Sequence, residues 1–289
     1  MYASLMTRAI GIKDFSLEES IALAADTGFA GVWFDIASAK AIADEGGVEH
    51  LKELFSSRGV RPGGWGATVR WQDDAQRDAD LEALKPLAEL GVELGNPFTT
   101  TGIMPGNNER PYDEQYAFIL ERLRPFAEVL KGAGVRLGIE FIAPKTLRNR
   151  FTHEFIYSMP DMLQLGRDVG TGNIGVLFDV WHHYTAHGTV ADLDMITRDD
   201  VQVVHVNDAP AGIEIDEQID SARLLPMESG VIEAPAMIAK LEQLGFNGPV
   251  IAEPFSDRIN TIAETDPVAA AQETSDSIKK LFMAAGIPA

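Results

Sequence analysis

The sequence predicts a single-domain (β/α)8 TIM barrel over residues 1–289, and three observations support this fold class. Segments typical of buried strands alternate with segments of helical periodicity, which indicates a parallel sheet. The repeating unit is a helix, a glycine, an apolar strand and a polar loop, at a spacing of roughly thirty residues. Eight such units fit the length of the chain. The alternative is an open doubly wound sheet, but the chain has neither Gly-x-Gly-x-x-Gly after its first strand nor a Gly-Lys-Ser/Thr phosphate loop.

In the first half of the chain, local signals mark four strands and three helices. Ser16-Leu-Glu-Glu19 has the form of a capping box, and the helix that it opens should end near Thr27, before Gly28. Leucines then recur at helical spacing between residues 73 and 90. The predicted strands are 2–6, 32–35, 60–65 and 91–94; the predicted helices are 16–27, 47–57 and 73–90; and 96–111 is predicted to be a turn-rich loop.

In the second half the same unit repeats four more times. A long helix over 112–131 contains Pro125, and Ser158-Met-Pro-Asp161 begins another helix that should end near Gly170. The predicted strands are 135–141, 174–179, 201–207 and 249–253; the further helices are 190–197, 234–244 and 268–283; and 143–158 and 208–230 are predicted to be long loops.

Composition narrows the class of protein. The formal net charge is −20, from 24 Lys and Arg against 44 Asp and Glu, and such a surface repels nucleic acid and anionic membranes. The absence of cysteine excludes disulfide and thiolate chemistry. Residues 1–10 lack the pattern of a signal peptide, and no apolar run approaches the ~20 residues that span a bilayer. We therefore expect a cytoplasmic protein that binds neither nucleic acid nor membrane.

Chemistry-bearing residues follow the apolar strands at four places. The run 174–178 meets Asp179, and three histidines follow before residue 188. In the same way Glu140, His205 and Glu253 lie at the ends of the fifth, seventh and eighth predicted strands. A carboxylate at the end of a buried strand costs free energy unless it is paired, hydrogen-bonded or bound to a metal.

These four residues are predicted to form one metal site. In a (β/α)8 barrel the carboxyl ends of the strands share one face, so Glu140, Asp179, His205 and Glu253 should converge there. Three crowded carboxylates force protons onto one another unless a cation lies between them. An oxygen-rich set with one imidazole suits Mn²⁺, Mg²⁺, Co²⁺ or Zn²⁺. Taken singly, each residue also fits a helix N-cap or an ion-pair partner.

Four stretches of the chain resemble a known family. They are Gly-Ile-Glu140-Phe, Leu-Phe-Asp179-Val-Trp-His182, Val-Val-His205-Val-Asn-Asp followed by Asp-Ser-Ala-Arg223, and Gly-Phe-Asn-Gly-Pro-Val-Ile-Ala-Glu253-Pro-Phe. They resemble the sugar isomerase and epimerase branch of the xylose isomerase-like TIM barrels, and most of all the 2-keto-myo-inositol isomerases. The likeness covers most of the chain and is strongest after Leu137.

The resemblance implies roles for individual residues. Glu140, Asp179, His205 and Glu253 would hold one divalent ion, with Mn²⁺ expected first, and Glu140 and Glu253 would form the catalytic acid–base pair. His182 and Arg223 would contact substrate. The implied activity is isomerisation or epimerisation of a keto-sugar or inosose, by proton transfer alpha to a carbonyl through a metal-bound enediolate.

The alternative activity is that of a lyase, which shares the first step, removal of the proton alpha to the carbonyl. Loss of a β-substituent after proton abstraction would give a dehydratase acting on an inosose, or β-elimination from a 3-keto-glycoside with C- or O-deglycosylation. His153, Lys145 or His183 would then supply the leaving-group acid, although each also fits an ordinary surface or loop residue. The loop 143–158, which carries two of them, matches no pattern of the epimerases.

Substrate identity is tied to the residues around the barrel mouth. Four tryptophans lie at or just after strand ends, where they fit either sugar stacking or the core; Trp65 is predicted as a substrate contact and Trp33 as core. Where family members often have Pro-Gly-x-Gly after the arginine, this chain has Pro226-Met-Glu-Ser-Gly230, and many relatives have an acid in place of Trp33. The acidic surface suggests a neutral substrate, with Arg223 as the contrary sign because an arginine can bind phosphate.

Two other classes of protein fit the sequence less well than a sugar enzyme. Endonuclease IV, a trinuclear zinc phosphodiesterase of the same superfamily, needs further histidines and a basic groove, but this chain has no histidine between His50 and His153. A non-catalytic barrel would not need the four strand-end residues. We expect a small-molecule carbohydrate as the partner, together with a homo-oligomer or, alternatively, a hetero-oligomeric partner subunit.

Overall fold

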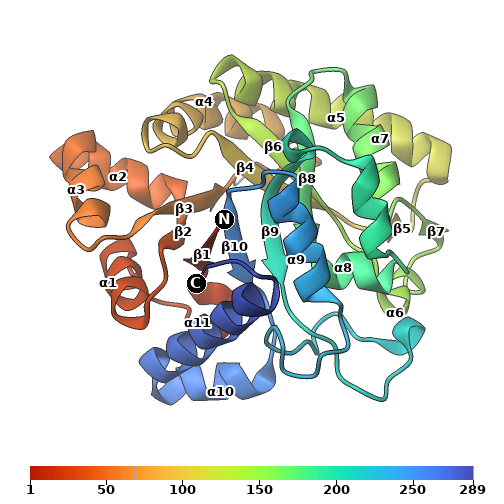
Figure 1. The fold of residues 1–289 in the computed structure, drawn as a ribbon. Helices are drawn as coiled ribbons and strands as arrows, with labels where there is room; N and C mark the ends of the chain where they lie inside the picture. Colours follow the sequence, from red (N-terminus) through yellow and green to blue (C-terminus); the bar gives the residue numbers. More distant parts are fainter. Residues whose placement is uncertain (68, 289) are drawn as a thin grey trace.

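The centre of the structure, a computed structural model that describes residues 1–67 and 69–288, is a closed barrel of parallel strands (Figure 1). Around the barrel the strands follow the order of the chain, and each pairs with its neighbours in sequence. The barrel strands are β1 (Tyr2–Leu5), β2 (Gly31–Asp35), β3 (Arg61–Gly66), β4 (Phe98–Ile103), β6 (Arg136–Phe141), β8 (Ile174–Asp179), β9 (Val201–Val206) and β10 (Pro249–Ala252). The predicted (β/α)8 fold class is confirmed.

Helices surround the barrel on its outer side (Figure 1). The longer ones are α1 (Leu17–Thr27), α2 (Ile36–Gly46), α3 (Val48–Ser56), α4 (Arg77–Glu93), α5 (Tyr112–Gly132), α7 (Met159–Val169), α9 (Ala234–Gln243), α10 (Asp257–Thr265) and α11 (Pro267–Ala284). The shorter ones are η1 (Thr7–Ile10), α6 (Lys145–Arg148), α8 (Val180–Thr185), η2 (Val190–Met195), η3 (Arg198–Asp200) and η4 (Ile215–Glu217). A small antiparallel pair, β5 (Gly106–Asn107) and β7 (His153–Glu154), lies outside the barrel. Among the described helices, none is long and apolar enough to cross a membrane.

The start of α1 follows the predicted capping box. The backbone N–H of Glu19 donates to Ser16 Oγ (3.2 Å), and the backbone N–H of Ser16 donates to Glu19 Oε2 (2.7 Å). At the other end Gly28 adopts a left-handed backbone with φ of 78°, which glycine reaches without steric cost. Local sequence signals therefore set both ends of this helix.

The fourth strand was predicted wrongly. Residues 91–94 continue α4, and β4 lies within the segment 96–111 that was predicted to be a loop. The reason is packing at Gly91: it lies against the indole of Trp65, so a side chain there would clash, and its place on the buried face of α4 matches helical spacing. β4 pairs with β6 from Phe98 to Ile103, and the Thr99 hydroxyl donates to the carbonyl of Trp65 (2.9 Å).

Several short elements also differ from the predictions. The sequence patterns missed α2, α8 and α10, and the predicted helix 190–197 is the 3₁₀ helix η2 over Val190–Met195. The loop 143–158 contains α6 and β7. The six-residue α8 carries too few residues for periodicity to mark it. In α8 the helix starts where the Asp179 carboxylate accepts the backbone N–H of Trp181 (2.7 Å).

A layer of apolar side chains fills the inside of the barrel below its carboxyl end. Leu177, Val203 and Ile251 form it, and Met6, Trp33 and Phe98 pack against them. Each of the first three lies two residues before a predicted metal ligand on the same strand. Because side chains at i and i+2 share one face of a strand, the ligands Asp179, His205 and Glu253 lie on this layer. The barrel core is thus the floor of the site.

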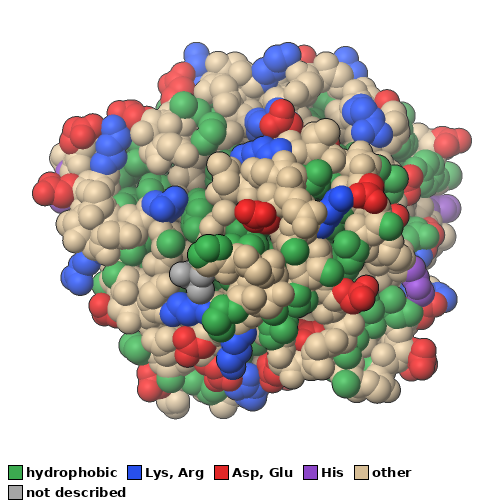
Figure 2. Space-filling view, in the orientation of Figure 1, with side chains coloured by type: hydrophobic (Ala, Val, Ile, Leu, Met, Phe, Trp, Pro, Cys, Tyr) green, Lys and Arg blue, Asp and Glu red, His purple; other side chains and the backbone are tan. Residues whose placement is uncertain are grey.

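The surface carries charges of both signs. On the face shown in Figure 2, Lys and Arg side chains lie singly among acidic and apolar ones. The expectation that the chain binds no nucleic acid stays a prediction.

Candidate active site

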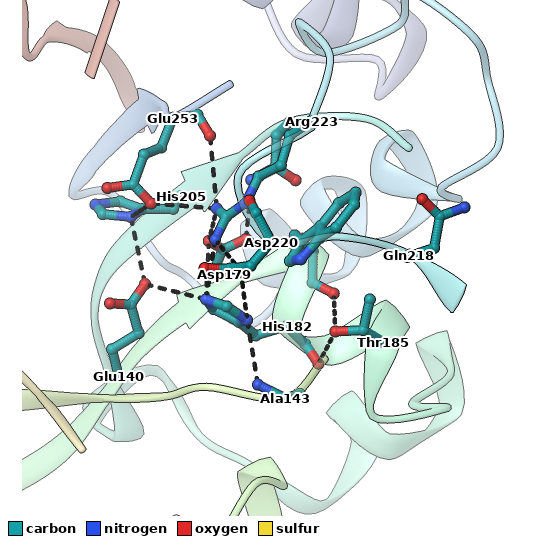
Figure 3. A network of polar contacts seen from close by, with 12 residues as sticks. Glu140, Ala143, Asp179, His182, Thr185, His205, Gln218, Asp220, Arg223 and Glu253 are labelled. Carbon is teal, nitrogen blue, oxygen red and sulfur yellow. Dashed lines mark hydrogen bonds and ion pairs between the residues drawn. The ribbon is translucent and has the colours of Figure 1, made fainter. Parts of the chain in front are cut away.

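Four side chains converge at the carboxyl end of the barrel. Glu140 (β6), Asp179 (β8), His205 (β9) and Glu253, which follows β10, each place one nitrogen or oxygen within 4.8 Å of those of the others. Glu140 and Glu253 lie on either side of His205 (Figure 3). The structure therefore brings together all four residues that the sequence predicted as a metal site, and we call them the strand-end cluster.

Several polar atoms of the strand-end cluster lack hydrogen-bond partners. Glu140 Oε1 and both ring nitrogens of His205 are buried without one among the residues that the structure describes. His205 Nδ1 lies 3.3 Å from Glu253 Oε2 and 3.6 Å from Glu140 Oε1, as ion-pair distances without hydrogen-bond alignment. Unsatisfied buried polar atoms cost free energy, and a cation between them would remove that cost. Three carboxylates and one imidazole fit a divalent metal ion.

Asp179 is fully buried and already has three partners. Its Oδ1 accepts the N–H of Trp181 (2.7 Å) and the side-chain amide of Asn207 (3.1 Å), while Oδ2 accepts Arg223 Nη1 (2.9 Å). Burial alone would raise the pKa of Asp179, but the guanidinium of Arg223, with His182 and His205, lowers it to about 2. The carboxylate is therefore ionised and held in one orientation.

The charge of His205 depends on its two glutamate neighbours. Burial lowers the pKa of the imidazole, yet the carboxylates of Glu253 and Glu140 outweigh burial and raise that pKa to about 10. In turn, burial raises the pKa of Glu253, whereas His205 and Arg223 lower it, and the net shift is downward. Without a metal ion, a proton on His205 partly neutralises the carboxylates.

Arg223 places a positive charge beside the strand-end cluster. It is 2% exposed, and Nη1 donates to Asp179 Oδ2 (2.9 Å) and Glu253 Oε2 (3.2 Å). Nε and Nη2 donate to the carbonyl and Oδ1 of Asp220 (2.9 and 2.8 Å). All three nitrogens thus face protein partners. The substrate contact predicted for Arg223 stays a prediction; the structure shows its guanidinium hydrogen-bonded to two residues of the strand-end cluster.

Aromatic rings hold the guanidinium from two directions. It lies 5.4 Å from the Trp181 ring and 4.7 Å from the Phe255 ring. Phe255 follows Glu253 by two residues and has a φ of 41°, in the left-handed region that bulky residues rarely adopt. This strained conformation places the ring against Arg223 directly after a cluster residue.

His182 faces the strand-end cluster from the first turn of α8. The backbone N–H of Ala143 donates to its Nδ1 (3.3 Å), and its Nε2 lies 4.0 Å from Glu140 Oε1 and 3.9 Å from Asp179 Oδ2 (Figure 3). Asp220 Oδ1 is 3.9 Å from Nδ1. The side chain is fixed beside the cluster, as a residue that contacts substrate would need to be.

Trp65 lies away from the mouth, so its prediction as a substrate contact needs correction. The side chain is fully buried, its indole N–H donates to the carbonyl of Asn96 (3.1 Å), and its ring packs against Gly91 of α4. It therefore points outward from β3 into the layer between strands and helices. Sequence position at a strand end could not reveal which face it occupies.

The three candidate leaving-group acids lie outside the strand-end cluster. Lys145 pairs with Asp216 (2.7 Å), which also accepts His187 (2.8 Å). His153 lies in β7, where it pairs with Asn107. His183 is buried within 2.9 Å of the Thr189 carbonyl, and burial lowers its pKa. None of the contacts described for them involves the strand-end cluster.

Sequence patterns missed three supporting residues. Asn207 orients Asp179, Asp220 orients Arg223, and Phe255 covers the guanidinium. Asn207 could have been found, because it lies two residues after His205 and so continues the same strand face. The other two lie in loops, where spacing carries no such information.

One family model and a curated relative match most of the chain. The model of a family described as "Xylose isomerase-like TIM barrel" matches residues 21–281. A curated relative, the inosose isomerase of Halalkalibacterium halodurans, is 22% identical over 234 residues, which cover 79% of this chain and 78% of the relative.

Solved structures share the fold along almost the whole chain. A xylose isomerase domain protein from Alicyclobacillus acidocaldarius subsp. acidocaldarius superposes with a TM-score of 0.87 at 26% identity, covering 99% of both chains. The IOLI protein with a bound zinc atom superposes with a TM-score of 0.75 at 17% identity, covering 98% of this chain and 99% of that one. At 17% identity, the second likeness is one of fold alone.

Proposed function

Because this chain belongs to the xylose isomerase-like TIM barrel family, we propose that it is a divalent-metal-dependent isomerase or epimerase of a keto-sugar or inosose. The inosose isomerase relative supports a polyhydroxylated six-carbon ketone as the substrate class. The observation that carries the proposal is the strand-end cluster, in which three carboxylates and an imidazole converge and in which Glu140 Oε1 and both ring nitrogens of His205 are buried without hydrogen-bond partners among the described residues.

The proposed ligands are Glu140, Asp179, His205 and Glu253, with Mn²⁺ expected first and Mg²⁺, Co²⁺ or Zn²⁺ as alternatives. When bound, such an ion supplies Lewis acidity, which acidifies the carbon next to a substrate carbonyl. Asp179 is fixed by Trp181, Asn207 and Arg223 and so acts as an ionised anchor.

Proton transfer is assigned to the two glutamates. In the barrel order, β6 and β10 are the outer strands of the four that carry the cluster, so Glu140 and Glu253 approach from two sides. One carboxylate can take the proton alpha to the carbonyl and the other can return one to a different position or face. His182, fixed by Ala143, is placed to hydrogen-bond a substrate hydroxyl.

A neutral substrate fits this site better than a phosphorylated one. Arg223 is the cationic side chain of the cluster, and its nitrogens face Asp179, Glu253 and Asp220. A phosphate would have to displace these partners, and it would also meet the carboxylates of the cluster.

The direct test is reaction in D₂O with a panel of keto-sugars and inososes. An isomerase incorporates deuterium alpha to the carbonyl, or carries the proton across, and releases no fragment. Release of water or an aglycone without any isomerised product would instead assign the lyase. The isomerase is favoured because both glutamates lie in the strand-end cluster, whereas Lys145 and His183 contact other groups and His153 lies on β7, outside the barrel.

Metal affinity should rise with pH. An imidazole binds metal only when neutral, and in the metal-free cluster Glu253 and Glu140 raise the pKa of His205 to about 10. Below that pKa each metal ion must displace a proton, so we expect affinity to increase about tenfold per pH unit and about 100-fold from pH 6 to 8. Calorimetric titration with Mn²⁺ in buffers of different ionisation heat measures both the affinity and the proton release.

The matched variant is His205→Gln, which offers an amide oxygen in place of the imidazole nitrogen and does not titrate. Its affinity should be lower and nearly independent of pH over the same range. An equal affinity of the unmodified protein at pH 6 and pH 8 would contradict the assignment of His205 as a ligand.

A further inference from the structure

A pocket of about 820 Å³ lies over the carboxyl ends of β1, β2 and β3. Met6, Trp33 and Gly66 form its inner wall, and Phe15 and Ile42 lie on its outer side. Pockets that hold ligands larger than one sugar ring measure about 300–1,000 Å³, and this one lies near the top of that range. The cluster residues belong to β6, β8, β9 and β10, so the pocket and the strand-end cluster occupy different parts of the barrel end.

The pocket reaches the barrel axis beneath the cluster. Met6 and Trp33 pack against Leu177, Val203 and Ile251, the apolar layer on which Asp179, His205 and Glu253 lie. Side chains two residues apart on a strand share a face, so the wall of the pocket and the floor of the cluster are one continuous apolar surface. Because the pocket lining follows β1, β2 and β3 and the cluster follows β6 to β10, both open at the carboxyl end of the barrel, where one molecule can contact both.

The sequence of β3 fixes the orientation of Trp33. The strand reads Arg-Pro-Gly-Gly-Trp-Gly, and a Cβ at Gly64 would clash with the six-membered ring of the Trp33 indole. The indole thus lies against bare backbone. At Gly66, which has ordinary backbone geometry, a Cβ would meet the indole at 3.9 Å, an ordinary contact. The glycines make room for a flat aromatic wall at the pocket.

The pocket combines polar and aromatic groups. Asp35 Oδ1 accepts both the backbone N–H and the hydroxyl of Ser38 (2.7 Å each), and Ser16 forms the capping box of α1. The exposed side chains of Arg8 and Glu18 also line the pocket. Beside these charges, Trp33 and Phe15, which is 37% exposed, offer a ligand aromatic surface.

We propose that this pocket binds an aromatic group attached to the sugar or cyclitol whose reacting carbon lies at the strand-end cluster. The attachment to a sugar rests on the proposed function; the preference for a planar apolar group rests on the pocket alone. The proposal makes the enzyme selective for aryl-substituted substrates, whichever of the two exits the reaction takes.

The test compares methyl β-D-glucoside with phenyl β-D-glucoside, two neutral molecules that carry no carbonyl and so do not react. Burying a phenyl group in the pocket should make the phenyl glucoside bind about 30-fold more tightly, the factor given by about 80 Å² of extra apolar burial. Titration of the purified protein followed by NMR gives both dissociation constants, and the phenyl protons should show contacts with the Trp33 indole.

Three variants and one control locate the preference. Trp33→Ala and Phe15→Ala should each reduce the ratio to about 5 or less, and Gly66→Val should abolish it by filling the pocket. Tyr112→Ala, which removes an aromatic ring that is 46% exposed on α5, should leave the ratio unchanged. Because Phe15 lies at the rim, Phe15→Ala serves as the variant whose folding is least in question.

Equal binding of the two glucosides, within a factor of 3, would overturn the proposal, as would a ratio that survives Gly66→Val. Neither outcome depends on metal or turnover. If the D₂O reaction fails while phenyl selectivity persists, the proposed function is wrong and the pocket assignment stands. If the D₂O reaction succeeds without phenyl selectivity, the proposed function stands and the pocket assignment is wrong.

Discussion

Changing either Glu140 or Glu253 to Gln should lower kcat by about 10²- to 10⁴-fold, the range for loss of a positioned acid or base. Glutamine keeps the shape of the side chain but can neither accept a proton nor supply a charged ligand. In an isomerase each glutamate handles a proton in every turnover, so the two losses should be comparable. The measurement is steady-state kcat with the best substrate of the D₂O panel.

An exposed glutamate on α5 provides the control. Glu114→Gln should leave kcat unchanged, because Glu114 lies on the outer helical layer away from the cluster. If one of the two cluster variants retains full activity, the pair does not act as acid and base. A variant that loses turnover but keeps exchange of the alpha proton identifies the glutamate that returns the proton, since the other glutamate can still remove it.

Arg223→Met should destabilise the metal-free protein by about 3–5 kcal/mol, because it leaves buried carboxylates without their partner. Asp179 is completely buried and the side chain of Glu253 is 14% exposed, and both accept Arg223 Nη1. Methionine fills a similar space but carries no charge. Urea unfolding of metal-free protein measures the loss, and saturating Mn²⁺ should make it smaller because the ion supplies positive charge at the same carboxylates.

The matched control is Arg258→Met. Arg258 also pairs with two carboxylates, Glu228 and Glu273, but its side chain is 45% exposed. Exposed pairs contribute about 0–1 kcal/mol, so this variant should change the free energy of unfolding little. An equal effect of the two substitutions would contradict the description of Arg223 as the buried centre of the charge network.

Much of the fold and the four cluster residues could be predicted from the sequence, for a physical reason. Buried parallel strands are continuous apolar runs, so an ionisable residue that ends such a run stands out, as Asp179 does after Phe178. Parallel strands in a barrel all end on one face, so residues at the ends of four strands are expected to lie in one site. The capping box at Ser16 is likewise a purely local signal.

What could not be predicted depends on contacts distant in sequence. Residues 91–94 are apolar enough for a strand, but Gly91 lies on the helical face that meets Trp65. The same contact turns Trp65 away from the mouth. The resemblance implied a substrate contact for Arg223, but its pairing with Asp179 and Glu253, 44 and 30 residues away, follows from no spacing rule. Such pairings appear only when the chain is folded.

The proposed reaction requires one divalent ion at the strand-end cluster. The most direct measurement is anomalous scattering from a crystal grown with Mn²⁺. We expect a single strong peak at 2.0–2.6 Å, the usual range of ligand distances, from side-chain atoms of Glu140, Asp179, His205 and Glu253. A crystal in which these four side chains lie more than about 6 Å apart, or in which the peak lies elsewhere, would contradict it.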